Sequence, residues 1–240
     1  MTANEVLQRF GNNIWTVDGA DVRMFGIPFS TRMTIVRLNS GGLWVHSPVE
    51  LDAAGFADID ALGPVEHVVA PNKIHSIGIV PWKKRYPSAV VWVSPGFAER
   101  HEDIPFDAAL GGGNPHWQNE IDEHVFLGSS WFDEVVFLHR ASKTLIVTDL
   151  IQKHEPDAQS WFWRRVKRYV GVLGVDGGTA KDLRATFRDK AAARRSREHV
   201  LAWDFDNLIV SHGLCVQGSA RSSVSRALSW LGTTPQSIES

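Results

Sequence analysis

Four short apolar segments of this chain end directly in polar residues. The segments have the length of buried strands, and the polar residues include types that bind ligands and metal ions. In α/β proteins, sites are built on the loops that follow strand ends. The sequence therefore predicts an α/β fold in which four strand ends contribute polar side chains to a site. The candidate site residues are His46, Asn72, His75, Asp149 and His212.

The 240 residues are enough for one large domain or two small ones, and we expect a single domain over residues 1–240. The chain is 43% apolar and 22% charged with a net charge of −2, which argues against a nucleic-acid partner. Its one cysteine, Cys215, excludes an internal disulfide and suits a reducing compartment. The first residues lack a secretory signal pattern, and no apolar run approaches the roughly 18 residues of a membrane span. We expect a cytoplasmic protein with a small-molecule substrate or ligand and no membrane partner.

Apolar patterning and turn residues predict a sheet with two helices in the first half of the chain. Strands are expected over residues 13–17, 22–25, 33–38, 43–46, 65–70 and 90–93. Asp18-Gly19 is predicted to form a turn between the first two strands. Residues 51–62 are predicted to be helical, and residues 76–86 to be a helix or irregular turn. Residues 99–119, rich in Gly, Pro and acidic residues, are predicted to be a long surface loop of the kind that often has a function.

The second half combines a hairpin with helices. A short strand is expected at 125–127, followed by a hairpin of residues 134–138 and 144–148. If residues 140–143 form the turn, His139 pairs with Thr144, and Glu134 faces the strand end at Asp149. The remaining predicted elements are helices near 159–173, 181–200 and 222–231 and a strand at 207–210. This order predicts two sheets packed face to face with helices outside them.

Five phrases of the chain, taken together, are similar to a known pattern. They are residues 32–38, 43–48, 70–75, 86–96 with Tyr86-Pro87 and Trp92-Val93-Ser94-Pro95-Gly96, and 144–150. Their order and spacing resemble the metallo-β-lactamase fold superfamily. The closer resemblance is to a bacterial family of degenerate members known only as a domain of unknown function. The resemblance implies a four-layer αββα sandwich in which helices flank two mixed β-sheets.

The resemblance also implies that part of the superfamily's metal site has been lost. Functional members carry His-x-His-x-Asp-His after a strand. Aligning His75 with the last histidine places Ala70, Asn72 and Ile74 at the other positions, so the catalytic aspartate is replaced by an apolar residue. A further histidine of the superfamily, about 19 residues before its bridging aspartate, falls on Ser130.

Other ligand positions are retained in the same resemblance. Asp149 matches the bridging aspartate, His212 matches the last histidine, and His46 stands where a supporting aspartate is usual. These residues, with His75 and Asn72, form the predicted ligand set for one divalent ion. Imidazole and carboxylate ligands suit Zn, Fe, Ni or Mn. The alternative is a hydrogen-bonded polar cluster without metal.

Four further residues are predicted to contact a substrate. Lys73 lies between Asn72 and His75 and offers a positive charge, although a solvated lysine is equally consistent with its position. His116 and Trp117 belong to the loop expected to cover the site, and Glu134 follows from the hairpin geometry. The basic stretch at 164–168 is interpreted as a solvated helix face, because acidic residues interrupt the basic residues that follow it.

Two functions remain open on the sequence. The first is a mononuclear metal-dependent hydrolase of an ester, lactone, thioester or phosphodiester, with an altered ligand set. The second is a non-catalytic relative whose pocket binds a small molecule or a partner without metal. The missing ligand positions favour the second function, and the polar residues kept at four strand ends favour the first.

Overall fold

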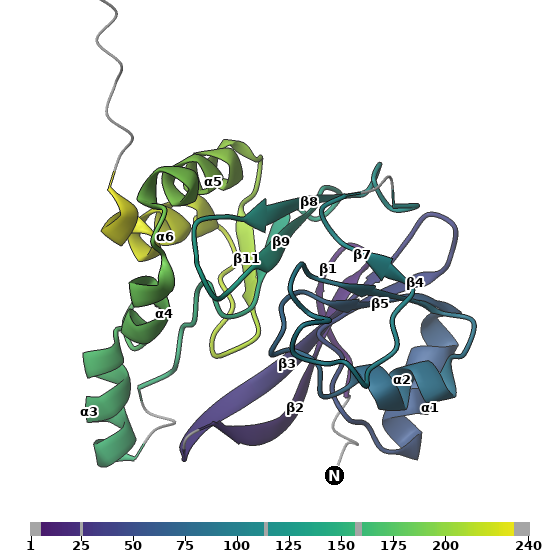
Figure 1. The fold of residues 1–240 in the computed structure, drawn as a ribbon. Helices are drawn as coiled ribbons and strands as arrows, with labels where there is room; N and C mark the ends of the chain where they lie inside the picture. The colour runs from purple at the N-terminus through teal and green to yellow at the C-terminus, as the bar shows by residue number, and fades with distance from the viewer. Residues whose placement is uncertain (1–5, 25, 113–114, 157–159, 233–240) are drawn as a thin grey trace, which may run out of the picture.

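The computed structural model of the chain describes residues 6–24, 26–112, 115–156 and 160–232. It contains a seven-stranded and a four-stranded sheet (Figure 1). The first sheet has the order β1 (Gln8–Gly11), β2 (Ile14–Met24), β3 (Ile27–Arg37), β4 (Leu43–His46), β5 (Val65–Ala70), β6 (Val90–Val93) and β7 (Ala108–Ala109). The second has the order β11 (Asn207–Val210), β10 (Thr144–Val147), β9 (Glu134–His139) and β8 (Ile121–Phe126).

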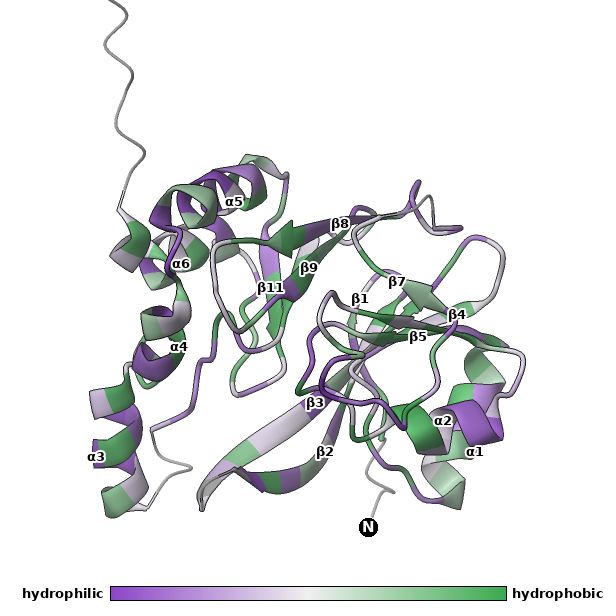
Figure 2. Cartoon of the chain, in the orientation of Figure 1, coloured by the Kyte–Doolittle hydropathy of each residue, from purple (hydrophilic) through white to green (hydrophobic). Residues whose placement is uncertain are grey.

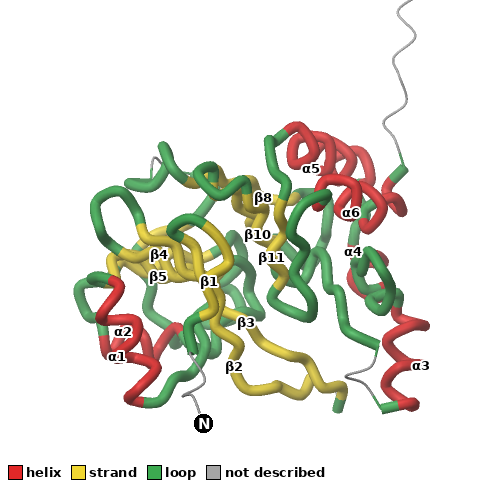
Figure 3. The backbone as a smooth tube through the Cα atoms, turned by 180° about the vertical axis from the view of Figure 1, so that it is seen from behind, coloured by secondary structure: helices red, strands yellow, loops and turns green. Residues whose placement is uncertain are grey.

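Both sheets are mixed. Strands β1 to β4 are antiparallel and β4 to β7 parallel, while in the second sheet only β10 and β11 run parallel. The helices are α1 (Ala53–Leu62), α2 (Ile79–Arg85), α3 (Trp161–Val170), α4 (Lys181–Thr186), α5 (Lys190–Ala202), α6 (Ala220–Ala227) and the short 3₁₀ helix η1 (Ser229–Leu231). Helices α1 and α2 lie on one side of the sheets and α4 to α6 on the other, as the ribbon and the tube views show (Figures 1 and 3). The predicted αββα sandwich is confirmed.

Alternation along the strands creates the layers. Val36 and Trp44, paired across β3 and β4, lie in the core between the sheets, whereas their neighbours Ile35 and Val45 pack in the core that contains α1 and α2. The second sheet behaves in the same way, because its strands also place successive side chains on opposite faces. In Figure 2 the helices carry hydrophobic and hydrophilic residues next to one another, as expected for helices with one face on a sheet.

The hairpin register predicted from the sequence is confirmed. Thr144 pairs with His139 and Leu145 with Leu138. Glu134 consequently lies beside the end of β10 and reaches the backbone of Asp149. The length of the turn sets this register. A slip of one residue would move the apolar side chains of a strand to its other face, so the alternative registers are unfavourable.

Two predicted features differ from the structure. Asp18 and Gly19 lie within the continuous strand β2, so the predicted turn is wrong. Gly19 is needed for packing, because a Cβ there would collide with Thr31 and Val49. The helix predicted over 181–200 is divided into α4 and α5, since the Asp189 side chain accepts a hydrogen bond from the backbone N–H of Ala192 and starts a new helix.

Smaller differences concern the ends of elements and the long loop. Strand β8 begins at Ile121, earlier than predicted, and the loop predicted over 99–119 includes the short strand β7. The last predicted helix is divided into α6 and η1. Within the part of the chain that the structure describes, no helix combines the length and the apolar character needed to cross a bilayer.

Candidate metal centre

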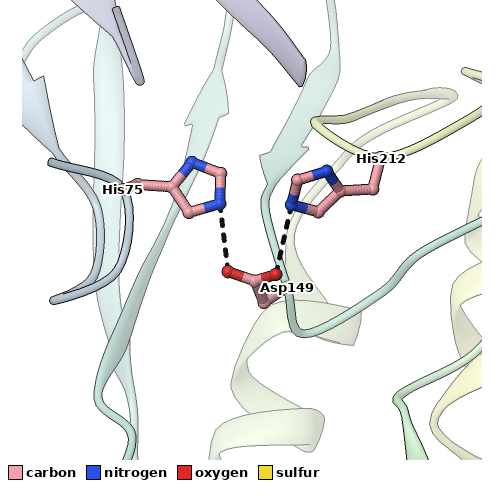
Figure 4. A group of neighbouring side chains, drawn as sticks. All are labelled: His75, Asp149 and His212. Carbon is pink, nitrogen blue, oxygen red and sulfur yellow. Dashed lines mark ion pairs between the residues drawn. The ribbon is translucent and has the colours of Figure 1, made fainter. Parts of the chain in front are cut away.

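Three side chains from three strand ends converge in the structure. His75 follows β5, Asp149 follows β10 and His212 follows β11. The Nε2 atom of His75 lies 3.0 Å from Asp149 Oδ2, and Nε2 of His212 lies 3.2 Å from Asp149 Oδ1 (Figure 4). One ligand atom of each residue falls within 4.8 Å of the other two. The neighbouring parallel strands β10 and β11 explain why Asp149 and His212 meet, and the packing of the two sheets brings His75 to them.

The other ring nitrogen of each histidine is held by a hydrogen-bonding group. Ser47 Oγ lies 2.6 Å from Nδ1 of His75, and the Ser30 carbonyl lies 2.5 Å from Nδ1 of His212. Metal-binding histidines in proteins are oriented by similar contacts, which select the tautomer and aim the opposite nitrogen. Both Nε2 atoms are therefore fixed toward the carboxylate between them.

Asp149 is the centre of a larger buried network. Its Oδ2 accepts a hydrogen bond from Nδ2 of Asn72 at 2.9 Å, and its Oδ1 accepts one from Nε2 of Gln152 at 3.2 Å. Burial opposes the ionisation of Asp149, but the charges and hydrogen bonds of His75 and His212 outweigh it and hold the pKa of Asp149 well below its usual range. The carboxyl group is therefore a carboxylate, which is the form that binds a metal ion.

A second buried carboxyl group holds the loop that carries Asp149. Glu134 accepts hydrogen bonds from the backbone N–H groups of Thr148, Asp149 and Leu150 at 2.7, 2.8 and 2.9 Å. Burial, with a further contribution from the charge of Asp149, raises the pKa of Glu134 to about 7. Glu134 thus positions the strand end, and it is not among the residues that line either cavity of this region.

The contacts of His212 define how it can bind a metal. A carbonyl oxygen can only accept, so Nδ1 of His212 donates to Ser30. When Nε2 also faces Asp149, it too must donate, which makes the ring an imidazolium. Burial lowers the pKa of His212, but the hydrogen bond and charge of Asp149 raise it further, and the net shift is upward. Loss of the Nε2 proton would leave a lone pair aimed at the position between the three residues.

Two cavities meet at this centre. The first has a volume of about 280 Å³ and is lined by residues that include Thr31, Ser47, His75, Asp149 and His212. The second has a volume of about 290 Å³ and extends toward α3 and α4. Phe29, Ile74 and Asp149 line both. The arrangement gives the polar centre a wall of apolar groups, which is typical of small-molecule sites.

Of the other predicted ligands, Asn72 lies in the network and His46 lies beside it. The Asn72 oxygen accepts from the backbone N–H groups of Ile74 and His75, so its amide N–H₂ group is the part turned toward Asp149. His46 is fully buried and stacks on Trp44, with ring centroids 5.4 Å apart. Neither of its ring nitrogens meets a hydrogen-bond partner among the described residues.

The residues predicted to contact substrate lie in different places. Lys73 Nζ lies 4.7 Å from the ring centroid of Trp131, and His116 is exposed beside His67. Trp117 is fully buried in the core between the sheets. Like Glu134, these three residues are not among those that line the two cavities at the centre. Their proposed contact with a substrate stays a prediction.

The structure adds residues that sequence reasoning missed. Ser30 and Ser47 hold the histidines, and Gln152, His154 and Lys167 continue the network away from Asp149. The only local signal is the spacing Asp149-x-x-Gln152-x-His154, which follows the strand end directly. Ser30 and Lys167 carry no signal, because their roles depend on contacts between segments far apart in the chain.

One known protein family matches more than half of the chain. Residues 11–161 match the family described as "Domain of unknown function (DUF4336)". The protein belongs to this family. The matched residues include His75 and Asp149, whereas His212 lies beyond them. No curated protein matches the chain.

Solved structures show which fold this family member has. DIM-1 metallo-β-lactamase matches with a TM-score of 0.65 and 14% identity over 93% of this chain and 96% of its own. A metallo-β-lactamase from Pontibacter korlensis matches with a TM-score of 0.63 and 14% identity over 95% and 99%. The Flv1 flavodiiron core from Synechocystis sp. PCC6803 matches with a TM-score of 0.63 and 10% identity over 94% of this chain and 60% of that one. The chain therefore has the metallo-β-lactamase fold.

Proposed function

We propose that the protein is a mononuclear metal-dependent hydrolase in which His75, Asp149 and His212 hold one divalent ion. The observation that carries the proposal is the convergence of the two Nε2 atoms on one buried carboxylate, with each Nδ1 already engaged. Two imidazoles and a carboxylate match the three protein ligands of catalytic zinc sites, and the same set also suits iron. The cavity of about 280 Å³ beside the three residues offers room for a substrate.

The residues around such a metal site would have different roles. A divalent ion bound there would supply Lewis-acid activation of an ester, lactone, thioester or phosphodiester oxygen. Ser47 and the Ser30 carbonyl orient the two imidazoles, and Asn72 holds Asp149 Oδ2 by its amide group. Glu134 fixes the backbone from which Asp149 projects. Ion binding would require Nε2 of His212 to lose its proton, so binding should release protons to solution.

A second function is favoured by a different observation. The carboxylate of Asp149 meets N–H groups of Asn72, His75, Gln152 and His212, which satisfies it without any ion. In addition, the apolar residue Ile74 stands at the position of the superfamily's catalytic aspartate and lines both cavities. The alternative is therefore a non-catalytic protein that binds a small molecule over a closed polar cluster.

Zinc loading separates the two functions. The protein is stripped with EDTA, incubated with excess Zn²⁺, desalted and measured by elemental analysis. The hydrolase proposal expects about one zinc per chain, lost in His212→Ala and retained in the matched control His199→Ala, an exposed residue of α5 whose ring stacks on His124. Zinc-dependent hydrolysis of p-nitrophenyl esters or bis-p-nitrophenyl phosphate would then support catalysis. Absence of bound metal from the wild-type protein after separate incubations with Zn²⁺, Fe²⁺, Ni²⁺ and Mn²⁺ would reject the hydrolase and leave the alternative.

A further inference from the structure

A buried lysine lies at the side of the second cavity. Lys167 of α3 is only 3% exposed and lines this cavity with Val166 and Val170 of the same helix. Its ammonium group lies 3.2 Å from Nδ1 of His154 and 5.5 Å from the ring centroid of Phe29. The sequence places it in a basic stretch that looks solvated, so its burial is a property of the fold.

The ammonium group of Lys167 has unused hydrogen-bond donors. It carries three N–H groups, and the hydrogen bonds of the described residues use one of them, on a neutral imidazole. Among those residues, no carboxylate lies within ion-pair distance of it. Burial lowers the pKa of Lys167 to about 8, while the charge of Asp21 opposes this shift. A buried cation without a counter-ion is unfavourable, and a bound anion would remove that cost.

A directional chain of hydrogen bonds joins Lys167 to the candidate metal centre. The ammonium donates to Nδ1 of His154, whose Nε2–H donates to the Gln152 oxygen at 3.2 Å. The Gln152 amide then donates to Asp149 Oδ1. Because the Lys167 ammonium donates to Nδ1 of His154, this nitrogen carries no proton, and the His154 ring is neutral with its proton on Nε2. Burial, and then the charge of Lys167, accordingly lower the pKa of His154 to about 3.

The rest of the cavity is largely apolar. Phe132, Val172 and Leu183 line it together with Phe29 and other residues. Two carboxyl groups also face it, but each already accepts hydrogen bonds. Asp149 is engaged as described above, and the Asp182 side chain accepts from the backbone N–H of Leu183 at 2.9 Å. Lys167 is therefore the charged group with unused capacity.

We propose that this cavity binds an apolar chain that ends in a carboxylate or phosphate, with Lys167 as the counter-ion of the acidic group. The binding itself needs no metal ion and is independent of catalysis. Its extension to a substrate, with the bond to be cleaved near Asp149, rests on the proposed function. In that case the hydrolase acts on compounds that combine an apolar chain with an anionic group, because Asp149 lines this cavity too.

The test is calorimetric binding of octanoate, octyl phosphate and uncharged octanamide at pH 6.5 with EDTA present. The wild-type protein should bind at least one of the two anions about tenfold more tightly than octanamide, since charge-assisted hydrogen bonds are about twice as strong as neutral ones. Lys167→Met should remove that preference and leave octanamide binding unchanged. The control Lys181→Met, an exposed lysine at the start of α4, should keep it. The more tightly bound anion identifies the head group.

Further outcomes decide where the ligand lies. Val170→Phe fills the cavity, so it should weaken all three ligands. Equal binding of anions and octanamide by the wild-type protein would overturn the proposal, as would unchanged anion binding by Lys167→Met or Val170→Phe. Because EDTA is present, the result does not depend on zinc. A protein that binds none of the four divalent ions but discriminates through Lys167 would retain this inference and lose the hydrolase. A protein that binds a metal ion but does not discriminate through Lys167 would retain the hydrolase and lose this inference.

Discussion

Two groups of histidines in this protein differ in what their ring nitrogens meet. In the strand-end group, His75 and His212 have both nitrogens engaged, one by a carboxylate and one by a serine. In the interior group, His46, His67 and His139 lie within strands and face the core between the sheets. The first group is built to hold a fixed orientation, and the second fills aromatic and apolar space.

Environment therefore assigns the roles of these residues. Burial lowers the pKa values of His67 and His139 to about 4, and burial with the charge of His75 lowers that of His46 to about 3. These rings stay neutral at physiological pH and need no counter-charge to remain buried. His212, which is equally buried, has its pKa raised because a carboxylate faces it. A histidine at a strand end becomes a candidate ligand only where the fold supplies that carboxylate.

The largest expected effect comes from removing the support of the strand-end group. Glu134→Ala leaves three buried backbone N–H groups without an acceptor, and we expect a loss of about 4 kcal/mol in the free energy of unfolding. Guanidinium unfolding monitored by tryptophan fluorescence measures it. Glu134→Gln keeps one oxygen and should cost less. A loss below about 1 kcal/mol for the alanine variant would mean that Glu134 does not hold this strand end.

The next effect tests the boundary between the two groups. Zinc at 100 times its dissociation constant should raise the free energy of unfolding of the wild-type protein by about 2.7 kcal/mol. His75→Ala should remove this stabilisation because it deletes a ligand. His46→Phe should retain it, because the His46 nitrogens meet no described partner and the ring is stacked on Trp44. Loss of the zinc effect in His46→Phe would place His46 in the strand-end group.

A smaller effect should follow from loss of the contact that orients His75. Ser47→Ala removes the hydroxyl 2.6 Å from Nδ1, and outer contacts of this kind contribute about 10–100-fold to metal affinity. Competition with a fluorescent zinc chelator gives the affinity. Ser94→Ala is the matched control, since Ser94 Oγ is buried but has no hydrogen-bond partner among the described residues. Equal zinc affinity in the two variants would argue that Ser47 only packs against the ring.

The sequence contains enough information for the fold and for the centre of the site. Strand-length apolar runs and turn residues define the strands, and the turn after His139 sets the register that brings Glu134 to Asp149. The polar residues after the strands, together with the family resemblance, predict a site of His46, Asn72, His75, Asp149 and His212, and the structure brings the last three together where the two sheets pack. These are local patterns, so they can be read without knowledge of distant contacts.

The contacts around that centre could not be predicted in the same way. Lys167 and its neighbours Arg165 and Arg168 look alike in sequence, yet Lys167 is buried while the two arginines are exposed. Trp117 lies in a segment rich in loop residues but packs in the core between the sheets. In each case the position of the side chain depends on a segment distant in the chain, and residue type alone does not distinguish the two environments.

The smallest expected effect, and the one that tests the interior group directly, is the acid sensitivity of the fold. An unfolded histidine titrates near pH 6.5, whereas the pKa of buried His139 is lowered to about 4. Between these values the unfolded chain binds more protons, so the stability contributed by the neutral ring falls as the pH drops. From pH 7 to pH 5 the loss should be about 1–2 kcal/mol for this residue. Guanidinium unfolding at both pH values measures it.

The variant that isolates this effect is His139→Phe, which removes the titrating group but keeps an aromatic ring. Ser142, the hydrogen-bond partner of His139, can still donate to Thr144, so the loss of the imidazole leaves its hydroxyl engaged. The stability difference between pH 7 and pH 5 should shrink by the contribution of His139. An unaltered difference in His139→Phe would mean that this ring accepts a proton inside the folded protein. His139 would then resemble the strand-end histidines, which have charged partners, and the division between the two groups would not hold.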